Sequence, residues 1–158
     1  IAQLINKSNQ FNLTTRRYTE AEVAEMEQDP AVFTLQTRLK DRFGDFGMIN
    51  VVIFREDRFE GEPAWSADTW LMSCRVLGRR VEEAILMETA AHAKAAGVRY
   101  LIGEYIPTEK NGMVELHYEK LGFRRLGQGD SGRTDWVLDL SSYKAPELPA
   151  EIKSAVLV

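Results

Sequence analysis

The sequence predicts an α/β (α+β) fold, in which a mixed, mainly antiparallel sheet is flanked by helices. Apolar strand patterns follow one another with short breaks between residues 33 and 76. Helix patterns at 79–96 and 110–121 then alternate with further strand patterns. A strand meander followed by helix-linked strands gives a mixed sheet with helices on its faces.

Composition narrows the class of protein. The 158 residues suit one domain, and 44% hydrophobic with 28% charged residues is ordinary for a globular chain. No apolar run is long enough to span a bilayer, so we expect no membrane contact. The net charge of −4 and the scattered basic residues argue against broad nucleic-acid binding.

Cysteine usage and the chain start give further expectations. The lone Cys74 excludes an internal disulfide and predicts a reducing, cytoplasmic location. We expect no metal site in this domain. Because the chain opens with Ile1 instead of methionine, we expect it to be part of a longer polypeptide.

The N-terminal part is expected to contain a linker and one helix. Residues 1–18 are rich in Asn, Gln and Thr, which predicts an extended linker. Thr19 and Glu22 have the spacing of a capping box, so a helix is predicted from there to about Gln28. Asp29-Pro30 ends it, because the residue before proline avoids the helical region.

A meander of strands is predicted next. Alternation from Phe33 to Leu39 and a continuous apolar run at 46–54 predict two strands, the second covered on both faces. The charged stretch 55–66, with its glycine and proline, predicts a loop. Alternation over 69–76 predicts a third strand. One of its faces carries Trp70, Met72, Cys74 and Val76.

Helices and strands alternate in the last part. The pattern at 79–96 predicts a helix ended by Gly97, and 99–106 predicts a strand. A helix is predicted at 110–121, followed by short strands from Phe123 and over 134–140. The predicted core positions of the helix at 79–96 are Val81, Ala84, Ile85 and Ala91. Those of the helix at 110–121 are Val114, Tyr118 and Leu121. We expect the domain to cover 19–140, with a tail at 141–158.

The stretch from Arg75 to Val81 predicts an anion site. A strand, a turn with Gly78 and a helix start come together there. The first turn of a helix leaves backbone N–H groups unpaired and carries partial positive charge, so a phosphate fits it. We expect backbone N–H groups of residues 78–81 to bind phosphate.

The order of elements resembles the GNAT acyltransferase fold. Arg75-x-x-Gly78-x-Arg80 resembles that family's pyrophosphate loop, and Asn111…Tyr118…Gly122-Phe123 resembles its second cofactor motif. The resemblance implies binding of coenzyme A or of phosphopantetheine on a carrier protein. The implied cofactor-binding residues are Arg75, Gly78, Arg79, Arg80, Val81 and Asn111. Arg80 stands where the family prefers a residue with almost no side chain, so it either crowds the pyrophosphate or binds it.

Three longer stretches, at 1–18, 68–79 and 103–108, resemble the FkbH-like family. Its members join a haloacid-dehalogenase-type phosphatase domain to a C-terminal GNAT-like domain. The resemblance implies that this chain is the C-terminal portion. It also implies loading of a glyceryl unit from 1,3-bisphosphoglycerate onto an acyl carrier protein in polyketide biosynthesis.

Three residues are candidates for catalysis, each with a structural alternative. Cys74 is either an acyl-accepting nucleophile or a buried small side chain. Glu104, in the strand expected beside that of Cys74, is either a general base or a hydrogen-bonded structural carboxylate. Tyr118 either protonates a departing thiolate or packs in the core. His92 and His117 lie on helix patterns and are weaker candidates.

Polar residues near the N-terminus are candidates for substrate binding. Asn9, Asn12 and Thr15, with Thr14 and Arg16 beside them, suit a polyol or phosphate, although such residues also bond to their own backbone in loops. Asn111 either caps a helix or holds the pantetheine arm.

The sequence therefore predicts acyl (glyceryl) transfer to the phosphopantetheine thiol of an acyl carrier protein. Two alternatives stay open. One is an N-acetyltransferase that uses acetyl coenzyme A. The other is a non-catalytic domain that docks carrier protein through a basic patch of Arg79, Arg80, Arg124 and Arg125.

Overall fold

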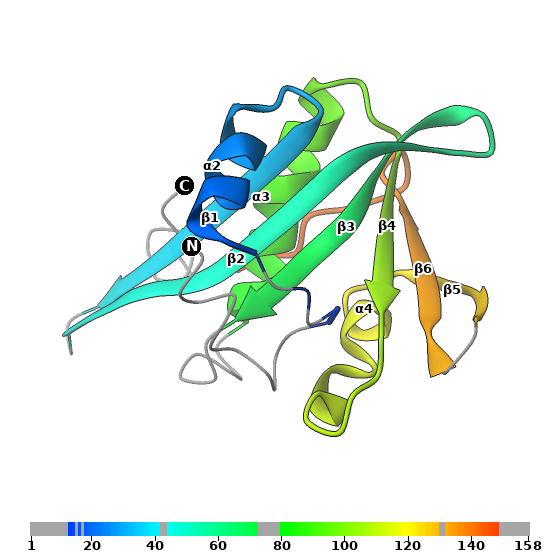
Figure 1. Ribbon diagram of the computed structural model, residues 1–158. Helices are drawn as coiled ribbons and strands as arrows, with labels where there is room; N and C mark the ends of the chain where they lie inside the picture. The colour runs from blue at the N-terminus through cyan, green and yellow to red at the C-terminus, as the bar shows by residue number, and fades with distance from the viewer. Residues whose placement is uncertain are drawn as a thin grey trace.

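The computed structural model describes residues 13–14, 16, 18–41, 44–72, 80–129 and 132–148. Six strands form one sheet in the order β1-β2-β3-β4-β6-β5. Helix α2 packs on one face of the sheet, and α3 and α4 pack on the other (Figure 1). The predicted fold class, a mixed sheet flanked by helices, is confirmed.

The elements have the following bounds. The strands are β1 Val32–Asp41, β2 Gly44–Phe59, β3 Glu62–Met72, β4 Tyr100–Tyr105, β5 Arg124–Gln128 and β6 Thr134–Asp139. The helices are α2 Glu20–Gln28, α3 Val81–Ala95 and α4 His117–Lys120, with a 3₁₀ turn at Gly112–Val114. The β3–β4 pair is parallel, and the four other pairs are antiparallel.

Strand β2 shows why both faces of the sheet are covered. Its side chains alternate, as strand geometry requires. Val52 and Phe54 enter the main core beneath α3, whereas Val51 and Ile53 pack against α2. The prediction of a strand buried on both faces is confirmed. Helix α2 begins as predicted, since the Thr19 hydroxyl accepts a hydrogen bond from the Glu22 N–H at 3.1 Å.

The predicted loop at 55–66 is wrong. Strands β2 and β3 continue through this stretch and form a hairpin whose last pair is Phe59–Glu62. The turn residues Glu60 and Gly61 have φ of 51° and 79°, and such positive values match the twist of a two-residue hairpin turn. Glu56, Asp57 and Arg58 are exposed, but Phe59, Ala64 and Trp65 pack on apolar clusters, so backbone pairing and apolar contacts together extend these strands.

The predicted helix at 110–121 is also wrong in part. It divides into the 3₁₀ turn and the single-turn helix α4. Gly112 lies at the start of the 3₁₀ turn, and glycine disfavours a continuous helix because of its backbone entropy. In α3 the predicted core position Ala91 is exposed, and its neighbours Ala90 and Ala93 are buried instead.

Strands β3 and β4 separate after a short contact. They are paired as far as Ser66 and Ile102, and their ends then diverge (Figure 1). Leu13 lies between the separated ends: its N–H donates to the Trp70 carbonyl at 3.2 Å, and its carbonyl accepts from the Ile106 N–H at 2.8 Å. The Leu13 side chain is fully buried in the main core. The stretch expected to be a linker thus contributes to the sheet and to the core.

Tyr118 packs directly on the backbone of β4. A Cβ atom built on Gly103 would lie 2.5 Å from two ring carbons of Tyr118. The ring cannot move away easily, because it is 1% exposed and contacts the rings of Trp70 and Phe123. Position 103 therefore requires glycine so that the aromatic ring can lie against the strand.

Replacing Gly103 with alanine is expected to lower the free energy of unfolding by about 1–3 kcal/mol, the usual cost of overpacking a core. Urea denaturation measures the change. The matched control is Gly127→Ala in β5, where an added Cβ meets nothing within 4 Å. Equal losses in the two variants would mean that the contact with Tyr118 does not constrain this position.

Candidate functional site

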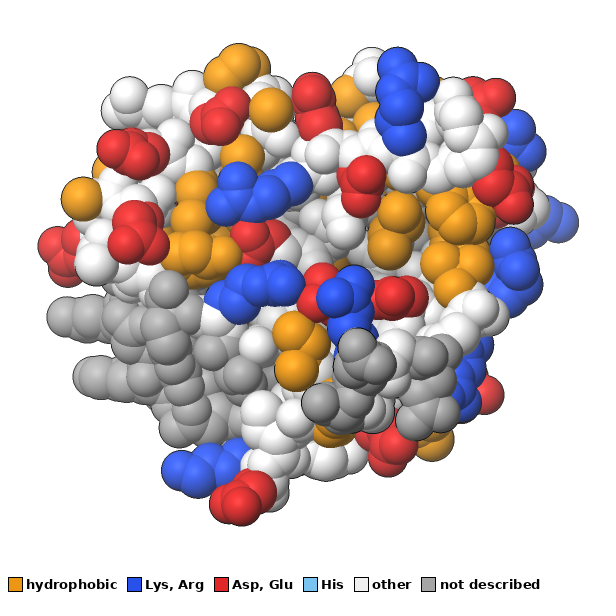
Figure 2. Space-filling model, turned by 45° about the vertical axis from the view of Figure 1, so that its right-hand side comes forward, with side chains coloured by type: hydrophobic (Ala, Val, Ile, Leu, Met, Phe, Trp, Pro, Cys, Tyr) orange, Lys and Arg blue, Asp and Glu red, His pale blue; other side chains and the backbone are white. Residues whose placement is uncertain are grey.

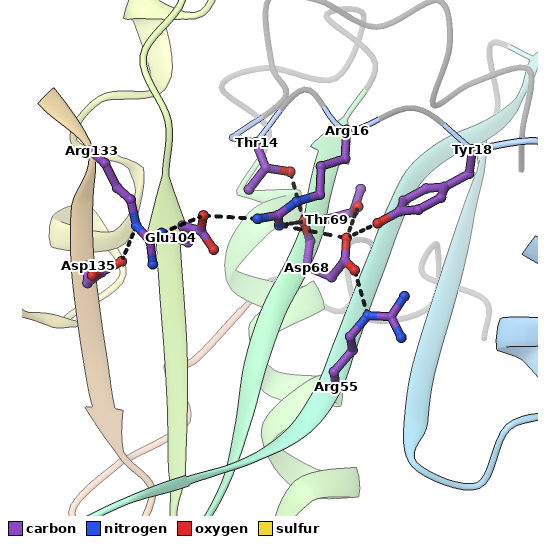
Figure 3. A network of polar contacts seen from close by, with 9 residues as sticks. All are labelled: Thr14, Arg16, Tyr18, Arg55, Asp68, Thr69, Glu104, Arg133 and Asp135. Atoms are coloured by element: carbon purple, nitrogen blue, oxygen red, sulfur yellow. Dashed lines mark hydrogen bonds and ion pairs between the residues drawn. The ribbon is translucent and has the colours of Figure 1, made fainter. Parts of the chain in front are cut away.

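Asp68 collects side chains from distant parts of the chain on the α2 face of the sheet. Its carboxylate accepts hydrogen bonds from the Tyr18 hydroxyl at 2.5 Å and from Arg55 Nε at 2.6 Å. Its backbone carbonyl accepts from the Thr14 hydroxyl and from Arg16 Nη1, both at 2.8 Å (Figure 3). Besides the Leu13–Trp70 backbone bond, the N-terminal segment is therefore held on β3 by the contacts of Asp68.

These contacts change the protonation of two groups. Burial alone raises the pKa of Asp68, but the hydrogen bonds from Tyr18 and Arg55 outweigh burial and hold it below its usual range. Burial, together with the hydrogen bond to Asp68, raises the pKa of Tyr18 to about 12. Asp68 is consequently ionised and Tyr18 protonated at neutral pH.

Beyond Ser66 and Ile102 the strands β3 and β4 are no longer paired, and this part of the sheet is here called the opening. Glu104 lies on β4, across the opening from Asp68 on β3. Its Oε1 atom accepts a hydrogen bond from Arg16 Nη2 at 3.0 Å and lies 3.6 Å from Arg133 Nη1. Arg133 also bonds to Asp135 on β6, at 3.2 Å. Charges of alternating sign thus cross the opening between β3 and β4 (Figure 3). In spatial order they are Asp135, Arg133, Glu104, Arg16, Asp68 and Arg55.

The three stretches singled out in the sequence meet in this network. Arg16 comes from the first stretch, Asp68 from the second and Glu104 from the third. Segments so far apart in sequence come together here because buried carboxylates require partners. Their meeting point lies where β3 and β4 separate.

Tyr118 approaches the same opening from the α4 side. Its ring lies against Gly103, and its hydroxyl lies beside the backbone of Glu104. Burial raises the pKa of the Tyr118 phenol. A phenol is protonated at neutral pH even at its ordinary pKa of about 10, and the raised pKa makes this one a weaker acid.

The two histidines are placed differently. His117 is buried with its ring 4.5 Å from that of Trp70, and burial lowers its pKa to about 3, so its imidazole is neutral at pH 7. His92 is exposed; its Nδ1 lies 2.9 Å from the carbonyl of Glu88, and its ring lies 5.2 Å from that of Phe33.

Three of the expected cofactor residues can be placed. Arg80 precedes α3 with φ of 61°, and its guanidinium forms two bonds to Glu83, at 2.7 and 3.1 Å. Val81 is buried at the start of α3. Asn111 is fully buried and does not cap the 3₁₀ turn with its side chain.

The Asn111 amide instead holds the loop after β4. Its Nδ2 donates to the Ile106 carbonyl at 2.8 Å, and its Oδ1 accepts from the Thr108 N–H at 2.7 Å. The remaining predicted site residues lie outside the described part of the chain and stay predictions. They are Asn9, Asn12, Thr15, Cys74, Arg75, Gly78 and Arg79.

The partners of Glu104 and Arg16 were not predicted from the sequence. Asp68 sits at the start of a predicted strand, and a carboxylate beside a run of apolar residues signals a buried charge that needs a partner. Nothing in the sequence says that Arg55 and Tyr18 supply those bonds. Arg133 likewise reaches Glu104 only because β6 pairs with β4.

The described residues show neither a metal-binding group nor a membrane-spanning helix. No group of three or more His, Cys, Asp or Glu side chains among them is arranged to hold a metal ion. No helix in the described ranges is both long and apolar enough to cross a membrane.

Comparison with known proteins identifies the fold. No protein-family model matches the sequence, and no curated protein matches it. Among solved structures, the GNAT domain of PAT from S. lividans has a TM-score of 0.62 at 17% identity, over 87% of this chain and 82% of that chain. An acetyltransferase from Thermus thermophilus has a TM-score of 0.57 at 20% identity, over 87% and 80%.

A third similar structure is FeeM, an N-acyl amino acid synthase from uncultured soil microbes. It has a TM-score of 0.54 at 13% identity, over 79% of this chain and 76% of that chain. The chain therefore has the GNAT fold, as its order of elements predicted. Identities this low establish the fold and not the reaction.

Replacing Asp68 with asparagine is expected to lower the free energy of unfolding by about 1–3 kcal/mol at pH 7, because hydrogen bonds to a charged acceptor are lost. The folded-state pKa of Asp68 is depressed, so its contribution is present above the unfolded pKa and is lost as pH falls through the folded value. The difference between wild type and variant should therefore shrink below about pH 4.

Denaturant unfolding at several pH values between 7 and 2.5 measures this difference. Asp57→Asn is the matched control, because Asp57 is an exposed aspartate on the same strand as Arg55. A difference between wild type and Asp68→Asn that stays constant over the whole pH range would contradict the role assigned to the carboxylate.

Proposed function

We propose that this domain transfers an acyl group to or from the thiol of a phosphopantetheine arm. The observation that carries the proposal is the opening between β3 and β4 in a GNAT fold, with Glu104 at its edge. The finer assignment is a glyceryl unit passed to an acyl carrier protein. Its support is the meeting of the three FkbH-like stretches at this opening.

The arm enters the opening with its phosphate at the start of α3. A helix of this length offers backbone N–H groups and partial positive charge at that end. Leu13 already pairs with the Trp70 carbonyl and the Ile106 N–H, so the arm cannot add to the sheet at these two groups. Side chains and the helix end therefore bind it.

The chemistry is exchange of an acyl group between two sulfur atoms. The incoming thiol attacks the carbonyl carbon of the thioester; a new C–S bond forms and the old one breaks. Glu104 takes the proton of the incoming thiol, and Tyr118 gives a proton to the departing thiolate. Cys74 serves as one of the two sulfur atoms, with the pantetheine thiol as the other.

Transfer of an acetyl group from coenzyme A to an amine is the second candidate function. The similar structures favour it, since they include an acetyltransferase and an N-acyl amino acid synthase. It uses the same opening and the same base, but needs an amine acceptor in place of the carrier thiol. The third candidate function is non-catalytic: the domain binds carrier protein and catalyses no reaction.

One experiment separates these readings. Protein incubated with a glyceryl thioester of a carrier protein should carry an acyl adduct that Cys74→Ser lacks, as seen by mass spectrometry. Glu104→Gln should slow transfer by about 10²-fold, the usual contribution of a general base. Glu119→Gln, at an exposed position on α4, is the matched control and should transfer at the wild-type rate.

Each alternative gives a different result. Acetylation of an amine by acetyl coenzyme A, without an adduct on Cys74, would replace the proposal with the second function. Binding of holo-carrier protein without turnover of either donor would leave docking as the function.

Replacing Arg80 with glycine is expected to strengthen coenzyme A binding several-fold. The substitution removes a bulky side chain from the expected phosphate site at residues 78–81. The positive φ of Arg80 suits glycine, so stability should stay equal or rise by up to about 1 kcal/mol. Calorimetric titration with coenzyme A measures the affinity. Lys94→Gln removes one charge from the other end of α3 and serves as the control. Weaker binding by Arg80→Gly would identify the guanidinium as a ligand.

A further inference from the structure

Three arginines from different elements lie along the opening: Arg16, Arg55 and Arg133, here called the arginine row. Their side chains are 37%, 44% and 47% exposed. The carboxylates that hold them are much less exposed, at 8% for Asp68 and 10% for Glu104. Basic side chains lie beside acidic ones near the middle of this face (Figure 2).

Because the arginines are more exposed than Asp68 and Glu104, the surface potential here is more positive than the formal charge of the group suggests. The three arginines and the two buried carboxylates carry a net charge of +1, and the arginines face solvent while Asp68 and Glu104 lie inside. Asp135, the other partner of Arg133, is 35% exposed. An anion arriving from solvent meets guanidinium groups first, at short range and with little screening. A cation would have to pass the guanidinium groups to reach either carboxylate.

The row also keeps hydrogen-bond donors for a ligand. Arg55 bonds to Asp68 through Nε, and its guanidinium also interacts with the Tyr18 hydroxyl. Within the described residues, Arg133 uses Nε for Asp135 and Nη1 for Glu104, which leaves Nη2. A planar guanidinium with two unused N–H directions matches the geometry of a carboxylate or phosphate.

Arg99 shows that this arrangement is not a general property of the surface. Arg99 is 45% exposed and also pairs with two carboxylates, Glu62 at 3.9 Å and Asp139 at 3.5 Å. Those partners are themselves 49% and 34% exposed. At this place the arginine and both carboxylates are partly exposed to solvent, so the surface around Arg99 is not predominantly positive.

We propose that the arginine row binds a small oxyanion, a carboxylate or a phosphate group, carried by the acyl unit or by its acceptor. The assignment to a substrate rests on the proposed acyl transfer, since the row lies beside Glu104. It restricts the substrate class: one of the two reacting partners carries a negative charge near the reacting carbonyl. Acetyl and an unphosphorylated glyceryl group both lack the group that the row binds, so a glyceryl unit meets this requirement only while it carries a phosphate.

The test measures binding directly, without transfer. Glycerate, glycerol 3-phosphate and uncharged glycerol are titrated into the protein, and backbone amide and arginine Nε–H signals are followed by NMR. The two anions should bind saturably and shift the Nε–H signals of the row, and glycerol should not. The anion that binds more tightly identifies the group as carboxylate or phosphate.

Variants locate the site. Arg133→Gln should weaken binding by about fivefold or more, because a charge-assisted fork is lost. Arg133→Lys should recover part of the affinity, since it restores the charge without the fork. Arg99→Gln is the matched control and should bind as wild type does. Thermal unfolding of each variant verifies that it is folded.

Two results would overturn the inference. One is the absence of saturable binding of either anion by the wild-type protein. The other is an equal loss in Arg133→Gln and Arg99→Gln, which would make the effect one of net charge. Both results are independent of the acyl-adduct assay, so failure of the anion site and failure of the transfer function remain distinguishable.

Discussion

The contacts of Asp68 hold the N-terminal segment between the separated ends of β3 and β4, and the arrangement of this part of the sheet depends on them. Strands β3 and β4 part after a short parallel contact, and separated strands leave backbone groups without partners. Leu13 supplies those partners, but a single residue between two strands is held weakly by itself. The carboxylate and carbonyl of Asp68 bind the residues that follow Leu13, so a buried charge keeps the N-terminal segment in the sheet.

The same contact reaches the candidate base. Arg16 bonds to the Asp68 carbonyl through one terminal nitrogen and to Glu104 through the other. The position of the Glu104 carboxylate therefore follows from the position of the N-terminal segment. The same Arg16 contacts hold the N-terminal segment in the sheet and position the Glu104 carboxylate. Displacement of the segment would therefore alter both.

Local patterns in the sequence were sufficient for some elements and not for others. Side-chain period and capping residues predicted α2, α3 and the doubly covered β2, because these features act within a few residues. The β2–β3 hairpin was missed, since the charged residues at 55–58 hide the strand pattern and the pairing of the two strands depends on backbone hydrogen bonds between them. Glu104 was chosen from its strand, but its contacts to Arg16 and Arg133 depend on which strands become neighbours. The bond between Arg16 and Glu104 spans 88 positions of the chain, a separation at which no local pattern is informative.

The contact between Gly103 and Tyr118 has a consequence for how this site can change during evolution. The two positions share one volume, since the aromatic ring occupies the space that a Cβ atom at 103 would need. A side chain at 103 becomes acceptable only after the aromatic at 118 is replaced by something smaller, and that replacement removes the phenol beside Glu104. Relatives should therefore divide into two groups, those with glycine at 103 and tyrosine at 118 and those with a larger residue at 103 and a small one at 118. Covariation of this pair would mark lineages that lack the phenol beside Glu104.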